Sequence, residues 1–222
     1  NTAITTVTFA SGSQCEEIGD SAFSAKDAQT SHLTKIEFPQ SLKRIGKNAF
    51  FNCRKLTEIP AFPAGLITID DGAFYNATGV KTDLLVIPSS VTKIGKQAFR
   101  WCSNIKSVQV NSKTISLGSQ AFLLGQSNAT NRYINMSAVE NLTLGEPLND
   151  GKNVTLNIDR TTGVSVIYVA NNTIAAMLND ETNHPKTFDK EKTCIVSVNG
   201  GTVADSPTGL ASVTRADIQS WE

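Results

Sequence analysis

A six-residue segment that recurs five times constrains this chain more than any other feature. Every copy begins with Ile or Leu and ends in Ala-Phe, and four of the five have Gly in second place. The copies are residues 18–23, 45–50, 69–74, 94–99 and 117–122. The Phe residues are 27, 24, 25 and 23 residues apart. Similarity at a period of 20 to 50 residues is typical of a solenoid, in which each coil stacks on the next.

A second pattern precedes the motif. Residues 4–9, 33–38 and 105–110 are β-rich and carry apolar residues at places one, four and six. Weaker copies lie at 56–62, which has one extra residue, and at 85–87, after an insertion at 79–83. This is the LxxLxL pattern of a leucine-rich-repeat strand, whose apolar side chains point inward and whose other side chains face solvent. In four repeats the last strand residue lies seven residues before the motif Ile, and a turn and a short apolar pair fill the interval.

The motif itself is predicted to serve packing. Its Gly is expected to permit a backbone conformation that a Cβ would resist, and the polar pair to begin a short helical turn. Ala suits the close approach of neighbouring coils, and each Phe is expected to stack on the Phe of the next coil. The stacking residues are Phe23, Phe50, Phe74, Phe99 and Phe122.

The four cysteines form no CxxC pair, so they predict neither zinc nor a redox site. Cys53 and Cys102 each follow a motif Phe by three residues, a place where small residues dominate. We expect buried thiols there. A disulfide between them is not expected, because the repeat containing Ala77 lies between them and a disulfide cannot bridge Cα atoms more than ~7 Å apart.

Beyond Phe122 the motif fades, and the chain is divided into residues 1–130, the solenoid, 131–188, degenerate repeats with a closing module, and 189–222, an extension containing a β-hairpin. Residues 139–144 repeat the LxxLxL strand. Further strands are predicted at 154–158, 164–169 and 194–198, and helices at 173–178 and 212–222. Thr173 is the predicted N-cap of the first helix, and Asn199-Gly200-Gly201 predicts the hairpin turn.

Composition excludes several classes of function. With 20 basic and 20 acidic residues the net charge is zero, so the basic stripe that nucleic-acid binding requires is not predicted. No apolar run approaches the ~20 residues of a membrane span. The first residues show neither a basic region nor an apolar signal segment, and the sequence leaves open whether a leader was removed.

No catalytic constellation is found. The two histidines, His32 and His184, stand in positions expected to be exposed, and no HExxH, GxSxG or P-loop pattern occurs. Asp20, Asp70 and Asp71 lie in repeat turns, where solvated carboxylates are expected, since calcium needs several convergent oxygens. The sequence therefore predicts no catalytic residue, no cofactor and no metal.

The unit at residues 33–53 resembles the BspA-like, or Treponema pallidum-type, leucine-rich repeat, and the resemblance covers about residues 4–122. Residues 167–169 and the following segment are similar to the closing module of such proteins, although Ala170 replaces the usual Pro and no Tyr follows. The resemblance implies a non-catalytic cell-surface or secreted protein with a role in adhesion or protein binding. We expect a repeat solenoid, α/β or mainly β, with a right-handed coil of short parallel strands and short helical turns, degenerate C-terminal repeats and a β-rich end.

A ligand is expected on the outward strand positions, which stacking would join into a concave face. The candidates are Thr34, Lys35, Glu37, Thr57, Glu58, Lys106, Ser107 and Gln109. The expected partner is an extracellular protein, from a host or a bacterium. Three alternatives stay open: a face that is merely soluble, a passive spacer, and a carbohydrate-binding surface. Tyr75 and Trp101 would suit a sugar but are expected near the back of the coil.

Overall fold

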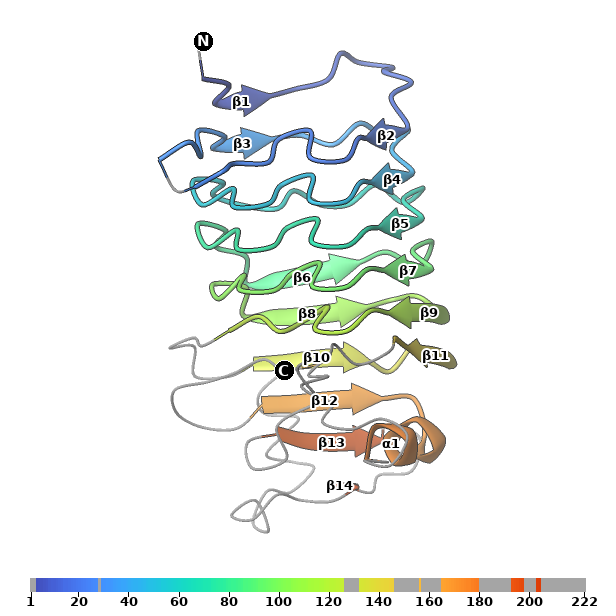
Figure 1. Cartoon of the computed structure of the whole chain (residues 1–222). Coiled ribbons are helices and arrows are strands. Elements are labelled where there is room, and N and C mark those ends of the chain that lie inside the picture. Colours follow the sequence, from blue (N-terminus) through green and yellow to red (C-terminus); the bar gives the residue numbers. More distant parts are fainter. Residues whose placement is uncertain are drawn as a thin grey trace.

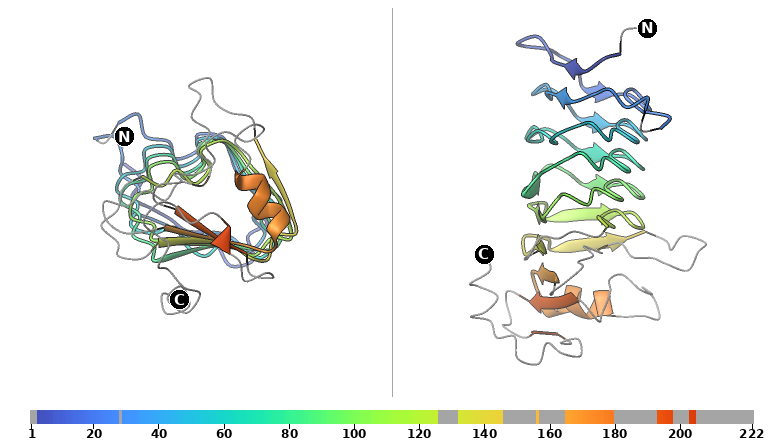
Figure 2. Two further views of the ribbon diagram at one scale, coloured as in Figure 1. Left: turned by 90° about the horizontal axis from the view of Figure 1, so that it is seen from below. Right: turned by 90° about the vertical axis from the view of Figure 1, so that its left-hand side faces the viewer.

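The chain forms a stack of coils along one axis (Figure 1). The computed structural model describes residues 3–27, 29–125, 132–145, 156, 165–179, 193–197 and 203–204. Seen along the axis, successive coils superimpose around a shared interior (Figure 2, left). This is the β-solenoid of parallel strands and little helix that the repeats predict.

One side of the stack is built from the predicted LxxLxL strands. β1 (Thr6–Val7) pairs in parallel with β3 (Lys35–Ile36) in a sheet of two strands. The other strands form a sheet of six: β6 (Leu84–Ile87), β8 (Ser107–Val110), β10 (Arg132–Met136), β12 (Ser165–Val169), β13 (Thr193–Ser197) and β14 (Val203–Ala204). All neighbours in it are parallel except β13 and β14, which are antiparallel, as the predicted hairpin requires. We call the outward side of these two sheets the strand face.

The short apolar pair before each motif forms a second parallel sheet. Its strands are β2 (Glu17–Ile18), β4 (Arg44–Ile45), β5 (Thr68–Ile69), β7 (Lys93–Ile94), β9 (Thr114–Leu117) and β11 (Asn141–Leu144). Neighbouring strands pair in register, so that the first residue of every motif copy lies level with that of the next. These five residues are all buried. Each coil therefore closes around the core between two sheets.

The Ala-Phe segments are turns, and the expected helical turn is wrong. The amide of Phe50 donates to the carbonyl of Ala73 in the next coil (2.7 Å), whereas the amide of Ala49 donates to Gly46 in its own coil (3.2 Å). Amides that donate within the coil thus alternate with amides that donate to the next coil. The alternation is possible because Asn48 and Asn52 adopt left-handed φ values of 54° and 57°. Half of the donors that a helix would use internally thus bond the neighbouring coil.

The motif Gly is required for close approach in three copies, at Gly46, Gly95 and Gly118, and the predicted reason for it is wrong. The left-handed residue lies two positions later, at Ser21, Asn48, Gly72, Gln97 and Gln120. A Cβ on Gly46 would lie 2.6 Å from Asp20 Oδ1 and 2.7 Å from the carbonyl carbon of Gly19. Because contacts that short do not occur in folded proteins, a larger residue would push the coils apart.

The predicted phenylalanine stack is confirmed. Successive ring centroids from Phe23 to Phe122 are 5.4, 4.9, 5.3 and 5.5 Å apart, with interplanar angles of 16°, 8°, 5° and 6°. All but the first ring are completely buried. Phe38 and Phe62 form a second stack beside it at 5.7 Å. Cys53 and Cys102 are buried free thiols, as predicted.

Two predictions for the C-terminal part need correction. Residues 141–144 pair with β9 in the second sheet, and β10 is the strand of the strand face in this coil. The reason is that both sheets contain the spacing apolar-x-x-apolar, as in Val91–Ile94, so the pattern alone does not tell them apart. The helix α1 (Asn172–Asn179) is present and contacts β12 and β13. Its cap is Asn171, whose Oδ1 accepts from the amide of Ile174 (3.0 Å), and not Thr173.

Leu156 is the one described residue of the strand predicted at 154–158. His184, the Asn-Gly-Gly turn and the helix predicted at 212–222 lie outside the described residues. The division of the chain at 130 and 188 stays a prediction.

Candidate functional site

The predicted binding residues lie along the strand face in three coils, those with the segments 33–38, 56–62 and 105–110. Lys35 and Glu37 are exposed and form a salt bridge of 2.9 Å. Thr57, Glu58 and Lys106 are exposed as well. Thr34 and Gln109 are half-buried. Stacking therefore brings these side chains onto one surface.

This surface is interrupted in its middle. Residues 56–62 form no strand, and β3 and β6 consequently belong to separate sheets (Figure 1). Pro60 has no amide to donate, and this segment holds one residue more than its neighbours. Stacking persists through Thr57, whose amide donates to Thr34 (3.1 Å) and whose carbonyl accepts from Lys81 (2.9 Å).

The threonine hydroxyls of the strand face hold the coils together. Oγ1 of Thr34 donates to the carbonyl of Thr5 (2.9 Å), and Oγ1 of Thr57 donates to the carbonyl of Thr34 (3.1 Å). Since a hydroxyl has one proton to donate, these two groups are left with acceptor capacity alone. Recognition of a ligand must therefore come mainly from the charged and apolar neighbours.

Ser107 is a correction to the predicted site, because it is buried. It lies in register between Leu84 of β6 and Tyr133 of β10, both much larger residues. Its hydroxyl accepts from the amide of Tyr133 (3.3 Å). A small side chain between two large ones is covered even on an outward position.

Two exposed apolar residues on the strand face were missed. Leu84 and Val86 of β6 are 41% and 42% exposed, while Leu85 and Ile87 point into the core. The signal was present in the sequence: a strand of four consecutive apolar residues must turn two of them outward. Val86 lies in register with Gln109, so the apolar pair adjoins the predicted polar residues.

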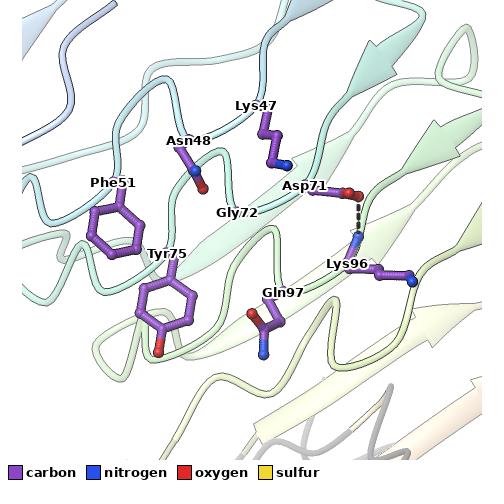
Figure 3. A pocket seen from close by; sticks show the side chains of 8 residues that line it. All are labelled: Lys47, Asn48, Phe51, Asp71, Gly72, Tyr75, Lys96 and Gln97. Atoms are coloured by element: carbon purple, nitrogen blue, oxygen red, sulfur yellow. Dashed lines mark hydrogen bonds between the residues drawn. The ribbon is translucent and has the colours of Figure 1, made fainter. Parts of the chain in front are cut away.

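A hollow lies on another surface, which we call the turn face and define as residues 47–51, 71–75 and 96–101 of three adjacent coils (Figure 3). Its volume is about 420 Å³. The lining residues are Lys47, Asn48, Phe51, Asp71, Gly72, Tyr75, Lys96 and Gln97. Beside it Phe51, Tyr75 and Trp101 form a row, with centroids 5.0 and 5.2 Å apart.

The repeat pattern of the whole stack matches a known family. The BspA type leucine rich repeat region matches in six copies over residues 16–143, more than half of the chain. The chain belongs to this family. BspA-type repeats, like leucine-rich repeats in general, commonly serve as protein-interaction modules, and the repeat fold is typically non-enzymatic.

A crystal structure described as the T. pallidum leucine rich repeat protein, TpLRR, is similar to this BspA-type chain. The sequences are 19% identical, the match covers 83% of this chain and 85% of TpLRR, and the TM-score is 0.44. No curated protein sequence is significantly similar to the chain.

Carboxylates of neighbouring coils in this BspA-type stack converge on one arginine. Arg44 pairs with Asp20 (2.7 Å), Asp70 (2.6 Å) and Glu17, and its hydrogen bond lowers the pKa of Asp20. Across the described ranges, no three His, Cys, Asp or Glu residues are grouped as a metal site would need.

Burial raises the pKa of both Cys53 and Cys102 to about 12. Each thiol donates to a phenylalanine carbonyl at 3.1 Å. A nucleophilic cysteine needs a low pKa and access to solvent, and these two have neither. His32 is exposed, as predicted. In the part of the chain that the structure describes, no helix has the length and apolar character needed to cross a membrane.

Proposed function

We propose that this chain is a non-catalytic protein-binding module at the cell surface or in secreted form, which holds an extracellular protein against its strand face as an adhesin does. One observation carries the proposal: Leu84 and Val86 stand exposed at the centre of the strand face. Paired exposed apolar side chains in a sheet are a cost to a protein that needs no partner, because they invite edge and face association.

The surroundings of the apolar pair have the composition of a protein interface. Such interfaces have an apolar centre and a polar rim. On one side the rim holds Lys106, which pairs with Asp83 (2.6 Å), and on the other side it holds Lys35 and Glu37. Exposed charges of this kind contribute more to partner choice and association rate than to affinity. The apolar centre is therefore expected to supply most of the binding energy.

The proposal of a partner outside the cell is supported by the family, because BspA-type proteins are typically secreted or surface-bound. The mixed charges of the rim favour a partner that is itself of mixed charge. A polyanion is disfavoured, because acidic groups alternate with basic ones along this face.

A binding screen tests the proposal. The intact chain, immobilised, is exposed to a panel of extracellular-matrix proteins and to a glycan array. We expect at least one matrix protein to bind with a Kd in the micromolar range or tighter. Binding to glycans alone would contradict the proposal.

The site is tested with the double variant Leu84→Ser/Val86→Ser. Loss of two apolar contacts at the centre of an interface is expected to weaken binding at least tenfold. Ile67→Ser is the matched control, because Ile67 is 45% exposed but lies beside β5 in the second sheet. Equal loss in the control would mean that the strand face is not the binding surface.

The predicted charged residues are tested separately. Replacing Lys35, Glu37 and Glu58 together by Ala is expected to slow association and to reduce its salt dependence, with a smaller loss of affinity. An unchanged association rate would mean that these three residues do not belong to the rim of the binding surface.

A further inference from the structure

The hollow on the turn face is lined by a coil that has Gly where its neighbours have longer side chains. Asn48, Gly72 and Gln97 occupy the same left-handed position in three successive coils. The Asn48 and Gln97 side chains stand on either side of Gly72, and Asn48 Oδ1 reaches over the place that a Cβ on Gly72 would take (Figure 3). In this copy alone the motif Gly has moved from second to fourth place. The third repeat therefore departs from the scaffold pattern where the hollow lies.

Trp101 departs from the scaffold pattern as well. Its equivalents in the two preceding coils are Asn52 and Asn76, and Asn tolerates the left-handed backbone of this position. Trp101 adopts φ 63° although a bulky residue is rare there, and its ring is 42% exposed. Strained and exposed residues are concentrated at functional sites. Trp101 therefore combines a left-handed backbone with an exposed ring, although the ring also contacts Tyr75 and Arg100.

Two rings of the aromatic row, Tyr75 and Trp101, have cation–π contacts with one arginine. The guanidinium of Arg100 lies 4.5 Å from the Trp101 ring centroid and 5.7 Å from that of Tyr75. Phe51, Tyr75 and Trp101 thus present a firm apolar strip along one side of the hollow. A ring held in place loses little freedom when a ligand binds.

The opposite side of the hollow carries two lysines, with the Asp71 carboxylate in the coil between them. Lys47 and Lys96 are exposed and occupy the same motif position two coils apart, about 10 Å at the usual strand spacing. Among the described residues neither ammonium group takes part in a salt bridge. The one carboxylate of the lining, Asp71, accepts the backbone amide of Lys96 (2.7 Å).

We propose that this hollow binds an acidic oligosaccharide, at a site separate from the strand face. The aromatic strip would contact the apolar C–H groups of a sugar ring. The Asn48 amide, the Gln97 amide oxygen and the Asp71 carboxylate would bond its hydroxyls, since the Gln97 NH2 group already donates to Gln120 (2.9 Å). Lys47 and Lys96 would pair with carboxylate or sulfate groups along the chain.

The size of the hollow favours a saccharide over a protein partner. Its 420 Å³ is in the range of small-ligand sites, about 300–1,000 Å³. A specific protein interface needs about 800 Å² on each partner, which one hollow of this size does not offer. An acidic peptide has the charge but not the dense hydroxyl groups that the polar lining matches.

Titration calorimetry of the intact chain tests the proposal with defined probes. The probes are an oligogalacturonate, a heparin-derived oligosaccharide, a neutral cello-oligosaccharide and an oligoglutamate peptide. We expect an acidic oligosaccharide to bind, more weakly at higher salt, and the neutral one to bind at least tenfold more weakly. The first two probes distinguish carboxylate from sulfate as the recognised group. No heat from either acidic saccharide at millimolar concentration, or tighter binding of oligoglutamate, would overturn the proposal.

Three variants locate the site. Gly72→Asn keeps a residue suited to the left-handed backbone and fills the hollow, against an Asn48 side chain that can rotate away. Lys47→Gln/Lys96→Gln removes the basic side, and Trp101→Asn restores the residue type of the neighbouring coils. Each is expected to weaken saccharide binding at least tenfold, with a melting temperature that is unchanged or, for Trp101→Asn, raised.

Lys35→Gln/Lys106→Gln is the matched control, because it removes the same charge from the strand face. The control is expected to leave saccharide binding within twofold of the original. If the control weakened binding as much as Lys47→Gln/Lys96→Gln does, the loss of affinity would follow from the change in net charge alone. That result would overturn the assignment of the site to the hollow. Because these tests use saccharides and turn-face variants, they can fail while the protein-binding proposal stands, and the reverse also holds.

Discussion

Replacing Phe74 by Ala probes the phenylalanine stack at its centre. The Phe74 ring is completely buried and stacks on Phe50 at 4.9 Å and on Phe99 at 5.3 Å. It also meets Phe62 at 6.2 Å. The change removes a whole ring from a place where no neighbour can move in without breaking its own stack.

The expected loss of unfolding free energy is about 3–5 kcal/mol. Transfer of a buried phenylalanine contributes about 2–3 kcal/mol, and the remaining cavity adds to this. The two stacked pairs contribute roughly 0.5–1.5 kcal/mol each beyond burial, so the upper half of the range is favoured.

Phe23→Ala is the matched comparison. Phe23 has the same place in the motif but is half-buried, and among the described residues its ring stacks on Phe50 alone, at 5.4 Å. We expect a loss of about 1–2 kcal/mol, since about half of the transfer term and one pair are removed.

Guanidinium denaturation followed by circular dichroism measures both variants. The slope of free energy against denaturant is compared with that of the original chain, because a stack of repeats can lose its cooperative unfolding when a central contact is cut. A loss below about 1 kcal/mol for Phe74→Ala, or one no larger than for Phe23→Ala, would refute the continuous stack.

The remaining predictions concern the glycine contacts and the thiols. Gly46→Ala is expected to destabilise by about 1–3 kcal/mol, because its Cβ would meet the preceding coil, whereas Gly19→Ala, with nothing within 4 Å of its Cβ, should be neutral in thermal denaturation. Alkylation of the native chain with iodoacetamide at pH 8, read by peptide mapping, should label Cys15 and spare Cys53 and Cys102. With a pKa of about 12 only ~1 in 10,000 of either buried thiol is ionised at pH 8, so labelling should rise only as the pH approaches that value. Labelling of all three cysteines at one rate would mean that Cys53 and Cys102 are accessible to the reagent and that the coils do not pack closely around them.

The scaffold was predictable because its residues repeat at one interval. Five copies of Ala-Phe indicate one buried ring in each coil, and rings at one position of stacked coils must lie over one another. The assignment of strands to sheets was less predictable. Both sheets use the same apolar spacing, so residues 139–144 fit either one, and only the pairing with β9 decides between them.

The surfaces were predictable only in part. The outward position of Lys35 and Glu37 follows from the strand period, but the burial of Ser107 depends on Leu84 and Tyr133, which neighbouring coils contribute. The turn face was assigned wholly to the scaffold because its left-handed residues were not foreseen.

Tyr75 and Trp101, expected at the back of the coil, stand in a row beside a hollow. A comparison of the motif copies does contain a signal, since the third copy places its Gly differently. That difference can be interpreted only once the fourth motif position is known to have a left-handed backbone.

The most direct test of the proposed function compares two variants on one sensor surface carrying the matrix protein found in the screen. Leu84→Ser/Val86→Ser changes the strand face, and Gly72→Asn changes the turn face. Surface plasmon resonance should show at least tenfold weaker binding of the first variant and unchanged binding of the second. Unchanged binding of the first variant together with loss in the second would contradict a partner held on the strand face.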